Sequence, residues 1–216
     1  MEETRSRTLI AVDVGVVQRL SRTIIRLNLA TREHHAAADA PWLDLMVPTV
    51  GRDTYVEHLV KVYGFEAPLE AALRYTPGLS ALVDLRPRTR AGLIVQDLMR
   101  LGLGASRTAG LAQRFTTFST AAEALGWMYV VERATLLHGA VRRYLTGHVA
   151  DVASASAYLS AYDGVAANRW SDLGSALETV AQVPSAKNQL LRAAHQGFLA
   201  LCEWFDGGTA LRSVGT

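Results

Sequence analysis

Three polar residues at helical spacing can present an imidazole to a metal ion. Thr31, His35 and Asp39 follow one another at intervals of four residues. On an α-helix this spacing places the three side chains in one stripe, because residues four apart are neighbours on the helix surface. A carboxylate one turn from a histidine can accept the ring N–H, fix the tautomer and leave the other nitrogen to a metal. The pattern alone is weak, because a single histidine on a helix is more often a surface or core residue.

These residues must be positioned by helices. A long segment with few glycines, residues 124–145, is expected to lie opposite the stripe. Hydrophobic periodicity predicts helices at 17–38, 54–63, 66–75, 89–103, 121–145, 153–161, 166–180 and 185–205. Gly64 and the Pro77–Gly78 pair are interpreted as turns. We therefore predict an all-α, single-domain helical bundle at 19–206, with an N-terminal extension at 1–18 and a C-terminal tail at 207–216.

The composition predicts a globular protein with a large buried core. Of the 216 residues, 50% are hydrophobic and only 19% are charged. The formal net charge is +2, and the basic residues are scattered along the chain instead of forming a stripe interleaved with aromatics. Nucleic acid is therefore not expected as a partner.

Cysteine usage and hydropathy predict the compartment. Cys202 is the single cysteine, so no intramolecular disulfide can form, and we interpret it as a core residue. The chain begins MEETRSR, which is not typical of a secretory signal, and it has no apolar run of about 18 residues that would span a bilayer. We expect a cytoplasmic protein without a membrane partner.

Other short patterns are not expected to carry chemistry. The glycines of LGLGASRTAG follow a predicted helix, whereas a phosphate loop would follow a strand. The basic run RPRTR, residues 86–90, is interpreted as a solvated connector. Paired Glu-x-x-His motifs are absent from the sequence, which disfavours a di-iron carboxylate site. The serines lack a nucleophile-elbow context, which removes the hydrolase interpretation.

The segment around His35 resembles a known family. LNLATREHHAAAD, residues 27–39, is similar to the proximal-helix signature of the bacterial, biliverdin-producing heme oxygenases, in which Leu-Arg-x-Ala-Thr precedes a heme-ligating histidine. Leu27, Ala30, Thr31 and His35 match it. Thr31 aligns with His35 and not with the adjacent His34. We therefore expect His34 to face solvent, and we assign no role to His58, His148 and His195.

The resemblance continues along most of the chain. ALGWMYVVERATLLHG, residues 124–139, is similar to the family's distal-helix segment. The retained residues there are Ala124, Leu125, Gly126, Tyr129, Val130, Glu132, Thr135 and Leu136. Further similarities occur in the same order in VYGFEAPLE, residues 62–70, and at Tyr55, Leu59, Tyr162, Gly164, Arg169, Trp170, Phe198 and Trp204.

The resemblance implies a heme oxygenase-like helical domain. Family members bind heme between two helices and use electrons and O₂ to convert it to biliverdin, carbon monoxide and iron, so that heme is both cofactor and substrate. Carried over, His35 is the metal ligand, Asp39 orients its ring, and Thr31 and Tyr129 line the heme site. The implied electron donor is a ferredoxin or flavodoxin reductase system.

Two departures from the family bear on activity. Distal glycines give room for heme and O₂ in the family, but here Arg133 replaces the first, while Leu137 and His138 replace the terminal pair. These positions are our candidates for catalysis: the leucine could crowd the oxygen site, the arginine could reach a propionate, and the histidine could ligate iron or point into a neighbouring helix. Asn28 replaces an arginine, and the cations that could instead pair with the propionates are Arg26, Arg142, Arg143 and Arg169.

Three hypotheses remain open at this point. The chain is an active heme oxygenase, or a heme-binding carrier or sensor without turnover, or a helical domain of the same fold that binds another ligand. The first predicts consumption of bound heme under reductant and O₂. The second predicts a stable heme spectrum, and the third predicts hemin binding that does not depend on His35.

Overall fold

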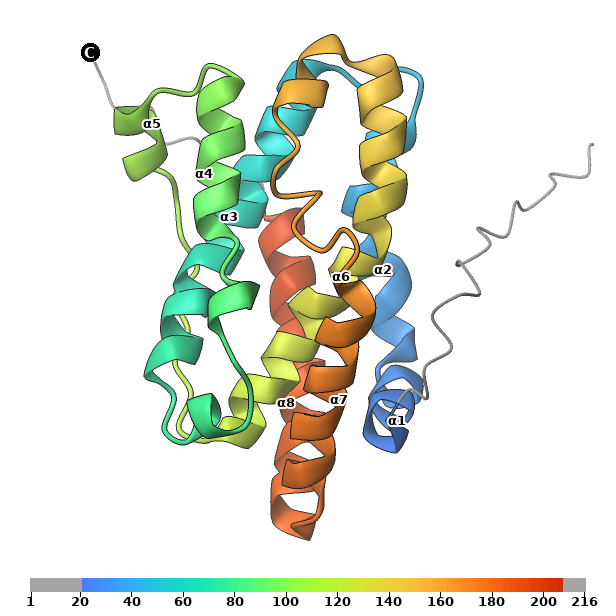
Figure 1. Ribbon diagram of the computed structural model, residues 1–216, viewed down its shortest axis with the longest axis vertical. Helices are drawn as coiled ribbons and strands as arrows, with labels where there is room; N and C mark the ends of the chain where they lie inside the picture. Colours follow the sequence, from blue (N-terminus) through green and yellow to red (C-terminus); the bar gives the residue numbers. More distant parts are fainter. Residues whose placement is uncertain (1–20, 208–216) are drawn as a thin grey trace, which may run out of the picture.

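Two long helices, α6 (Ala121–His148) and α8 (Pro184–Asp206), pack along each other through the middle of the molecule (Figure 1). They approach closely because α6 carries Gly126 at the contact. A Cβ at this position would lie 2.7 Å from the Ala193 Cβ and 2.7 Å from the Leu190 carbonyl oxygen. The computed structural model describes residues 21–207, and every regular element within them is helical. The predicted all-α fold is confirmed.

The N-terminal part of the described chain forms two helices where one was predicted. α1 (Arg22–Ala30) and α2 (Arg32–Leu43) are separated at Thr31, whose φ of −100° and ψ of 6° leave the helical region. α1 packs beside α7 (Ala166–Ala181), whereas α2 packs against α6 and α8. The short α1–α2 break is what sets the direction of the stripe that begins at Thr31.

A second pair of helices covers the opposite side of the bundle. α3 (Arg52–Tyr75) packs against α4 (Ala91–Arg100), and the short helix α5 (Ala105–Ala109) follows (Figure 1). The predicted turn at Gly64 is wrong, because α3 continues through it. Gly64 is a packing residue instead: a Cβ there would lie 2.4 Å from the Ala112 carbonyl oxygen and 2.6 Å from the Trp204 ring.

Short 3-10 turns connect the helices, at Asp44–Met46, Leu79–Ala81, Arg86–Arg88 and Ala150–Ser154. The helix predicted at 153–161 is wrong. This segment runs through turns because Asp97 of α4 fixes its backbone: the Asp97 carboxylate accepts hydrogen bonds from the Ala157 N–H at 2.9 Å and the Tyr158 N–H at 2.8 Å. A side chain from another helix thus satisfies donors that a helix would have satisfied internally.

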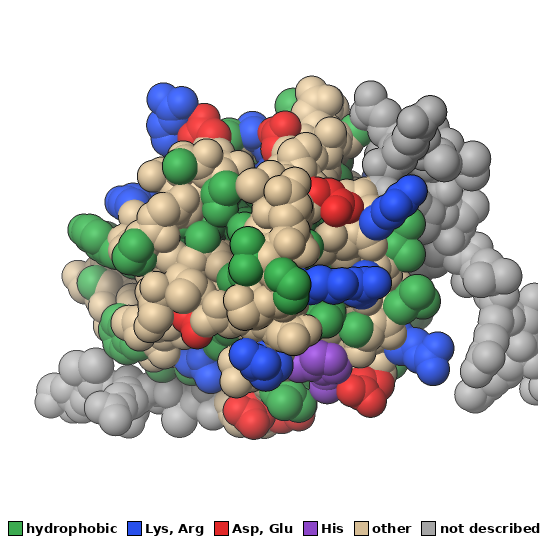
Figure 2. Space-filling view, turned by 90° about the horizontal axis from the view of Figure 1, so that it is seen from below, with side chains coloured by type: hydrophobic (Ala, Val, Ile, Leu, Met, Phe, Trp, Pro, Cys, Tyr) green, Lys and Arg blue, Asp and Glu red, His purple; other side chains and the backbone are tan. Residues whose placement is uncertain are grey.

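The described residues, 21–207, cover the predicted domain 19–206 except for its first two residues, and they include one residue after it. The predicted extension 1–18 and the tail after its first residue lie outside them. Among residues 21–207, none of the helices combines the length and apolarity needed to cross a membrane. The end of the molecule seen in Figure 2 carries acidic and basic side chains interspersed with hydrophobic ones, without a field of one sign.

Candidate functional site

The Thr31 hydroxyl positions the imidazole of His35. Thr31 Oγ1 donates to the Leu27 carbonyl at 2.8 Å and lies 3.2 Å from His35 Nε2. A hydroxyl has one hydrogen, and Thr31 donates it to the Leu27 carbonyl. The contact between Thr31 Oγ1 and His35 Nε2 is therefore a hydrogen bond only if Nε2 carries the proton and donates it. This arrangement places the ring proton on Nε2 and leaves the lone pair of Nδ1 for a ligand.

The environment of His35 favours a neutral ring. Partial burial lowers the pKa of His35 below its ordinary value, and the nearby positive charge of Arg133 lowers it further, against the opposing effect of Asp39. On its other side, the ring packs at a centroid distance of 5.4 Å from Phe198 of α8. A neutral imidazole of fixed tautomer is the state in which histidine binds a metal.

Asp39 does not orient His35 as expected. Its carboxylate forms a bidentate ion pair with Arg133 of α6, with contacts of 2.5 and 2.9 Å. The side chains are 21% and 16% exposed, so the pair is largely shielded from water. The physical reason is the guanidinium of Arg133, which matches the carboxylate in a planar fork that an imidazole cannot offer. The pair ties α2 to α6 across the stripe.

Tyr129 of α6 lies near Thr31, and its ring meets Phe198 edge to face at a centroid distance of 6.3 Å. Its side chain is buried, and burial raises the pKa of Tyr129 while the polar neighbours Asn28 and Thr31 act in the opposite direction. The structure thus brings together Thr31, His35, Asp39, Tyr129 and Arg133, which are five of the predicted site residues.

His138 lies in a different part of the core. Its ring packs 4.9 Å from Trp42 and 4.8 Å from Tyr158, measured between centroids. Neither ring nitrogen has a hydrogen-bond partner within residues 21–207. Burial, followed by the charge of Arg90, lowers the pKa of His138 well below its ordinary value. Trp42 is about two helical turns beyond His35, so the structure places His138 beside that later turn rather than over His35.

The remaining predicted residues are engaged elsewhere. Leu137 is half-buried and packs on the same apolar cluster as Trp42. Arg142 contacts Asp163 and donates to the Ser160 hydroxyl at 2.6 Å. Arg169 contributes its carbonyl oxygen, which accepts a hydrogen bond of 2.6 Å from Arg88. The structure does not bring these three residues to the His35 stripe.

His34 also differs from expectation. Its side chain is only 15% exposed, and its Nε2 lies 3.0 Å from Nδ1 of His195 on α8. Its ring stacks on Phe198 at a centroid distance of 5.8 Å and an interplanar angle of 20°. His34 therefore faces α8, not solvent.

A buried charge network behind α6 was missed by the sequence interpretation. Arg88 pairs with Glu132 at 3.0 Å, and Arg90 pairs with Glu66 at 3.1 Å. The two arginines are 6% and 3% exposed, so the solvated connector predicted for RPRTR is wrong at these two positions, whereas Arg86 is exposed. The hydroxyls of Tyr162 and Tyr158 donate to Glu132 at 2.6 Å and to Glu66 at 2.7 Å, respectively. A usable signal existed in the sequence: two glutamates within otherwise apolar stretches of helix require buried cations.

A small cavity adjoins this network and is lined in part by Glu70. Burial raises the pKa of Glu70 to about 7, although its carboxylate accepts the N–H groups of Arg90 at 2.6 Å and Ala91 at 2.9 Å. Glu70 can therefore hold or release a proton near neutral pH. A second small cavity is lined by Trp42, Phe205 and their neighbours. His35 lines neither cavity.

The arrangement of helices is shared with a solved protein. The heme oxygenase from Neisseria meningitidis, in its NO- and CO-bound structures, superposes with a TM-score of 0.67, covering 91% of this chain and 96% of that chain. The two chains share a fold. Their sequences are 16% identical, so the likeness concerns the fold alone. No family model and no curated protein matches the sequence.

Proposed function

We propose that this protein is a heme oxygenase that binds heme between α2 and α6 with His35 as the axial ligand. The observation that carries the proposal is the Thr31-held, neutral imidazole of His35, at 3.2 Å from the hydroxyl. The sequence around His35 is similar to the family's proximal helix, and the chain shares its fold with a heme oxygenase. Metal-bound histidines generally have their second nitrogen hydrogen-bonded in this way.

The residues around His35 fit the chemistry of heme in part. The imidazole is a suitable ligand for heme iron. The opposite wall carries Arg133 in place of a glycine, and its ion pair with Asp39 crosses from α6 to α2. Heme binding requires this pair to open. Arg133 would then be free to pair with a heme carboxylate, which is the kind of planar, bidentate partner it has in Asp39.

When bound, heme would supply an iron that activates O₂ with electrons from a ferredoxin or flavodoxin reductase system, giving biliverdin, carbon monoxide and iron. The chain's own residues have narrower tasks. Thr31 fixes the tautomer of His35, and Tyr129 lies buried beside Asn28 and Thr31. Glu132 is held in the interior by Arg88 and the Tyr162 hydroxyl, so it stabilises α6 from behind the site.

A second candidate function is heme binding without turnover, as in a carrier or sensor. It is favoured by Arg133, which lies near His35 where the resemblance predicts a glycine, because its side chain occupies space that the family leaves open for O₂. His138 is not needed for this candidate, since its ring is enclosed by Trp42 and Tyr158.

Hemin-loaded protein treated with ascorbate under air distinguishes the two functions. We expect the Soret band to decay while biliverdin absorbance grows in the wild type. A Soret band that survives many equivalents of reductant supports the binding function and contradicts turnover. The His148→Ala variant should behave as the wild type in this assay, because His148 lies at the exposed end of α6.

A further inference from the structure

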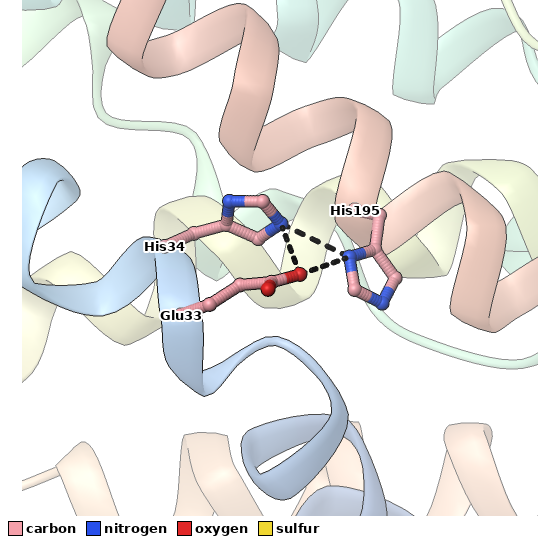
Figure 3. A group of neighbouring side chains, drawn as sticks. All are labelled: Glu33, His34 and His195. Atoms are coloured by element: carbon pink, nitrogen blue, oxygen red, sulfur yellow. Dashed lines mark hydrogen bonds and ion pairs between the residues drawn. The ribbon is translucent and has the colours of Figure 1, made fainter.

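We propose that Glu33, His34 and His195 form a second metal site, for a divalent transition ion of the zinc type, where α2 meets α8. The site is separate from the proposed heme ligand, and the proposal does not depend on heme binding. Figure 3 shows the three side chains converging from the two helices. His34 and His35 are adjacent on α2, but neighbouring helical residues point about 100° apart, so the two imidazoles serve different surfaces.

The distances between the three ligand atoms fit a shared ion. His34 Nε2 lies 3.0 Å from His195 Nδ1, and the same Glu33 oxygen, Oε1, lies 3.6 Å from the first and 3.9 Å from the second. The point that is equidistant from the three atoms within their plane lies about 2.1 Å from each. Zinc bonds to histidine nitrogen and to carboxylate oxygen are ~2.0–2.2 Å long.

The Glu33 carboxylate faces both rings without a hydrogen bond to either. At 3.6 and 3.9 Å its carboxylate oxygen is too far from either ring nitrogen for a hydrogen bond. The two imidazoles can share one proton at 3.0 Å, and that leaves the carboxylate facing them without a direct bond. An ion placed among the three atoms would bond to all of them at once.

The surrounding packing holds two of the three ligands in place. His34 stacks on Phe198, and the His34 and His195 rings meet edge to face at a centroid distance of 5.2 Å. The exposed fractions rise from 15% for His34 to 35% for His195 and 70% for Glu33, so the site opens to solvent on the Glu33 side. Two histidines and one glutamate, with a fourth position open to water, form a donor set that suits zinc.

The test is competition for Zn²⁺ between the full-length chain, free of any affinity tag and of heme, and a chromophoric chelator. We expect one zinc per chain. His34→Gln, His195→Gln and Glu33→Gln should each weaken zinc binding roughly tenfold or more, since even the loss of an outer-shell partner typically costs 10- to 100-fold. His148→Gln and His35→Ala are controls that should retain wild-type affinity.

Two further readouts keep the result interpretable. Far-UV circular dichroism of each variant establishes that it has folded, and Co²⁺ in place of Zn²⁺ should give visible d–d bands that the His34→Gln/His195→Gln double variant lacks. The proposal is overturned if the folded double variant binds zinc as tightly as the wild type, or if zinc binding is lost in His35→Ala instead. These zinc measurements use heme-free protein and do not report on the hemin spectrum. Failure of the zinc-site proposal is therefore distinguishable from failure of the proposed heme function.

Discussion

The Thr31 hydroxyl has a single hydrogen, and the Leu27 carbonyl takes it, so the hydroxyl oxygen is left to accept the Nε2–H of His35. At the scale of single residues this contact replaces the carboxylate–histidine pair that the spacing of His35 and Asp39 had suggested. Helical spacing correctly put the three side chains in one stripe. It could not show that a cation from another helix would bind Asp39 more favourably than the imidazole does.

Replacing the hydroxyl tests this role directly. Thr31→Val should weaken hemin binding roughly tenfold, because the ring of His35 would lose the bond that fixes its tautomer. Spectroscopic hemin titration measures the change. Thr76→Val is the matched control: Thr76 makes the same kind of bond, 2.8 Å to the Ala72 carbonyl, at the end of α3. Equal affinities of the two variants for hemin would show that Thr31 does not orient the ligand.

At the scale of elements, α6 determines how the bundle is closed on two sides. Against α8 it presents Gly126, whose missing Cβ permits the close approach of the helices. Against α2 it presents Arg133, whose pair with Asp39 joins the two helices near His35. The first feature is a requirement of packing, and the second is a polar contact that a ligand can displace.

Loss of the Asp39–Arg133 pair should favour heme binding. Asp39→Asn weakens the pair with Arg133, so we expect the heme-free protein to lose about 1 kcal/mol of stability and hemin to bind about fivefold more tightly. Urea unfolding and hemin titration measure the two effects. Asp151→Asn, which weakens the exposed pair with Arg52, should change neither by a comparable amount. Hemin affinity that falls in Asp39→Asn would mean that the carboxylate assists binding and does not obstruct it.

Alanine at two glycines of α6, Gly126 and Gly139, should change the free energy of unfolding in opposite directions. Gly126→Ala should lower the free energy of unfolding by about 2–4 kcal/mol, because the new methyl group would overlap Ala193 and the Leu190 carbonyl. Gly139→Ala should raise it by about 0.5–1 kcal/mol, because a Cβ there meets only the end of the Arg143 side chain at 3.6 Å and alanine favours the helix. Thermal or urea unfolding measures both, and similar effects at the two positions would contradict the packing account.

At the scale of the whole molecule, hydrophobic periodicity predicted the all-α bundle and most of its helices. It failed where tertiary contacts decide the backbone, as at Gly64, which packs under Trp204, and at 157–158, where Asp97 binds the N–H groups. It also failed for the interior pairs of Arg88 and Arg90. Charge runs near helix ends are usually solvated, and only the fold brings Glu132 and Glu66 within reach of these arginines.

The buried network should make stability depend on pH through Glu70. Its pKa is about 7 in the folded chain, above the ordinary 4.5, so the folded state binds the proton more tightly than the unfolded state does. Stability from this group is present below about pH 4.5 and is lost as the pH rises to about 7. Glu70→Gln should remove that loss and be more stable than the wild type at pH 8 by roughly 2 kcal/mol.

Urea unfolding at several pH values between 4.5 and 8 measures the dependence on Glu70. Glu57→Gln is the control, since Glu57 is exposed on the same helix, α3, and its substitution should leave the profile unchanged. Parallel profiles for Glu70→Gln and the wild type would exclude Glu70 as the source of the pH dependence.

The central claim is that His35 binds heme iron, and the most direct measurement is an optical hemin titration of the wild type and His35→Ala, without and with added imidazole. We predict a saturable Soret band for the wild type, a weakened and shifted band for His35→Ala, and recovery of the wild-type band when imidazole occupies the vacated position. A Soret band of equal position and affinity in both proteins, unaffected by imidazole, would contradict the assignment of His35 as the ligand.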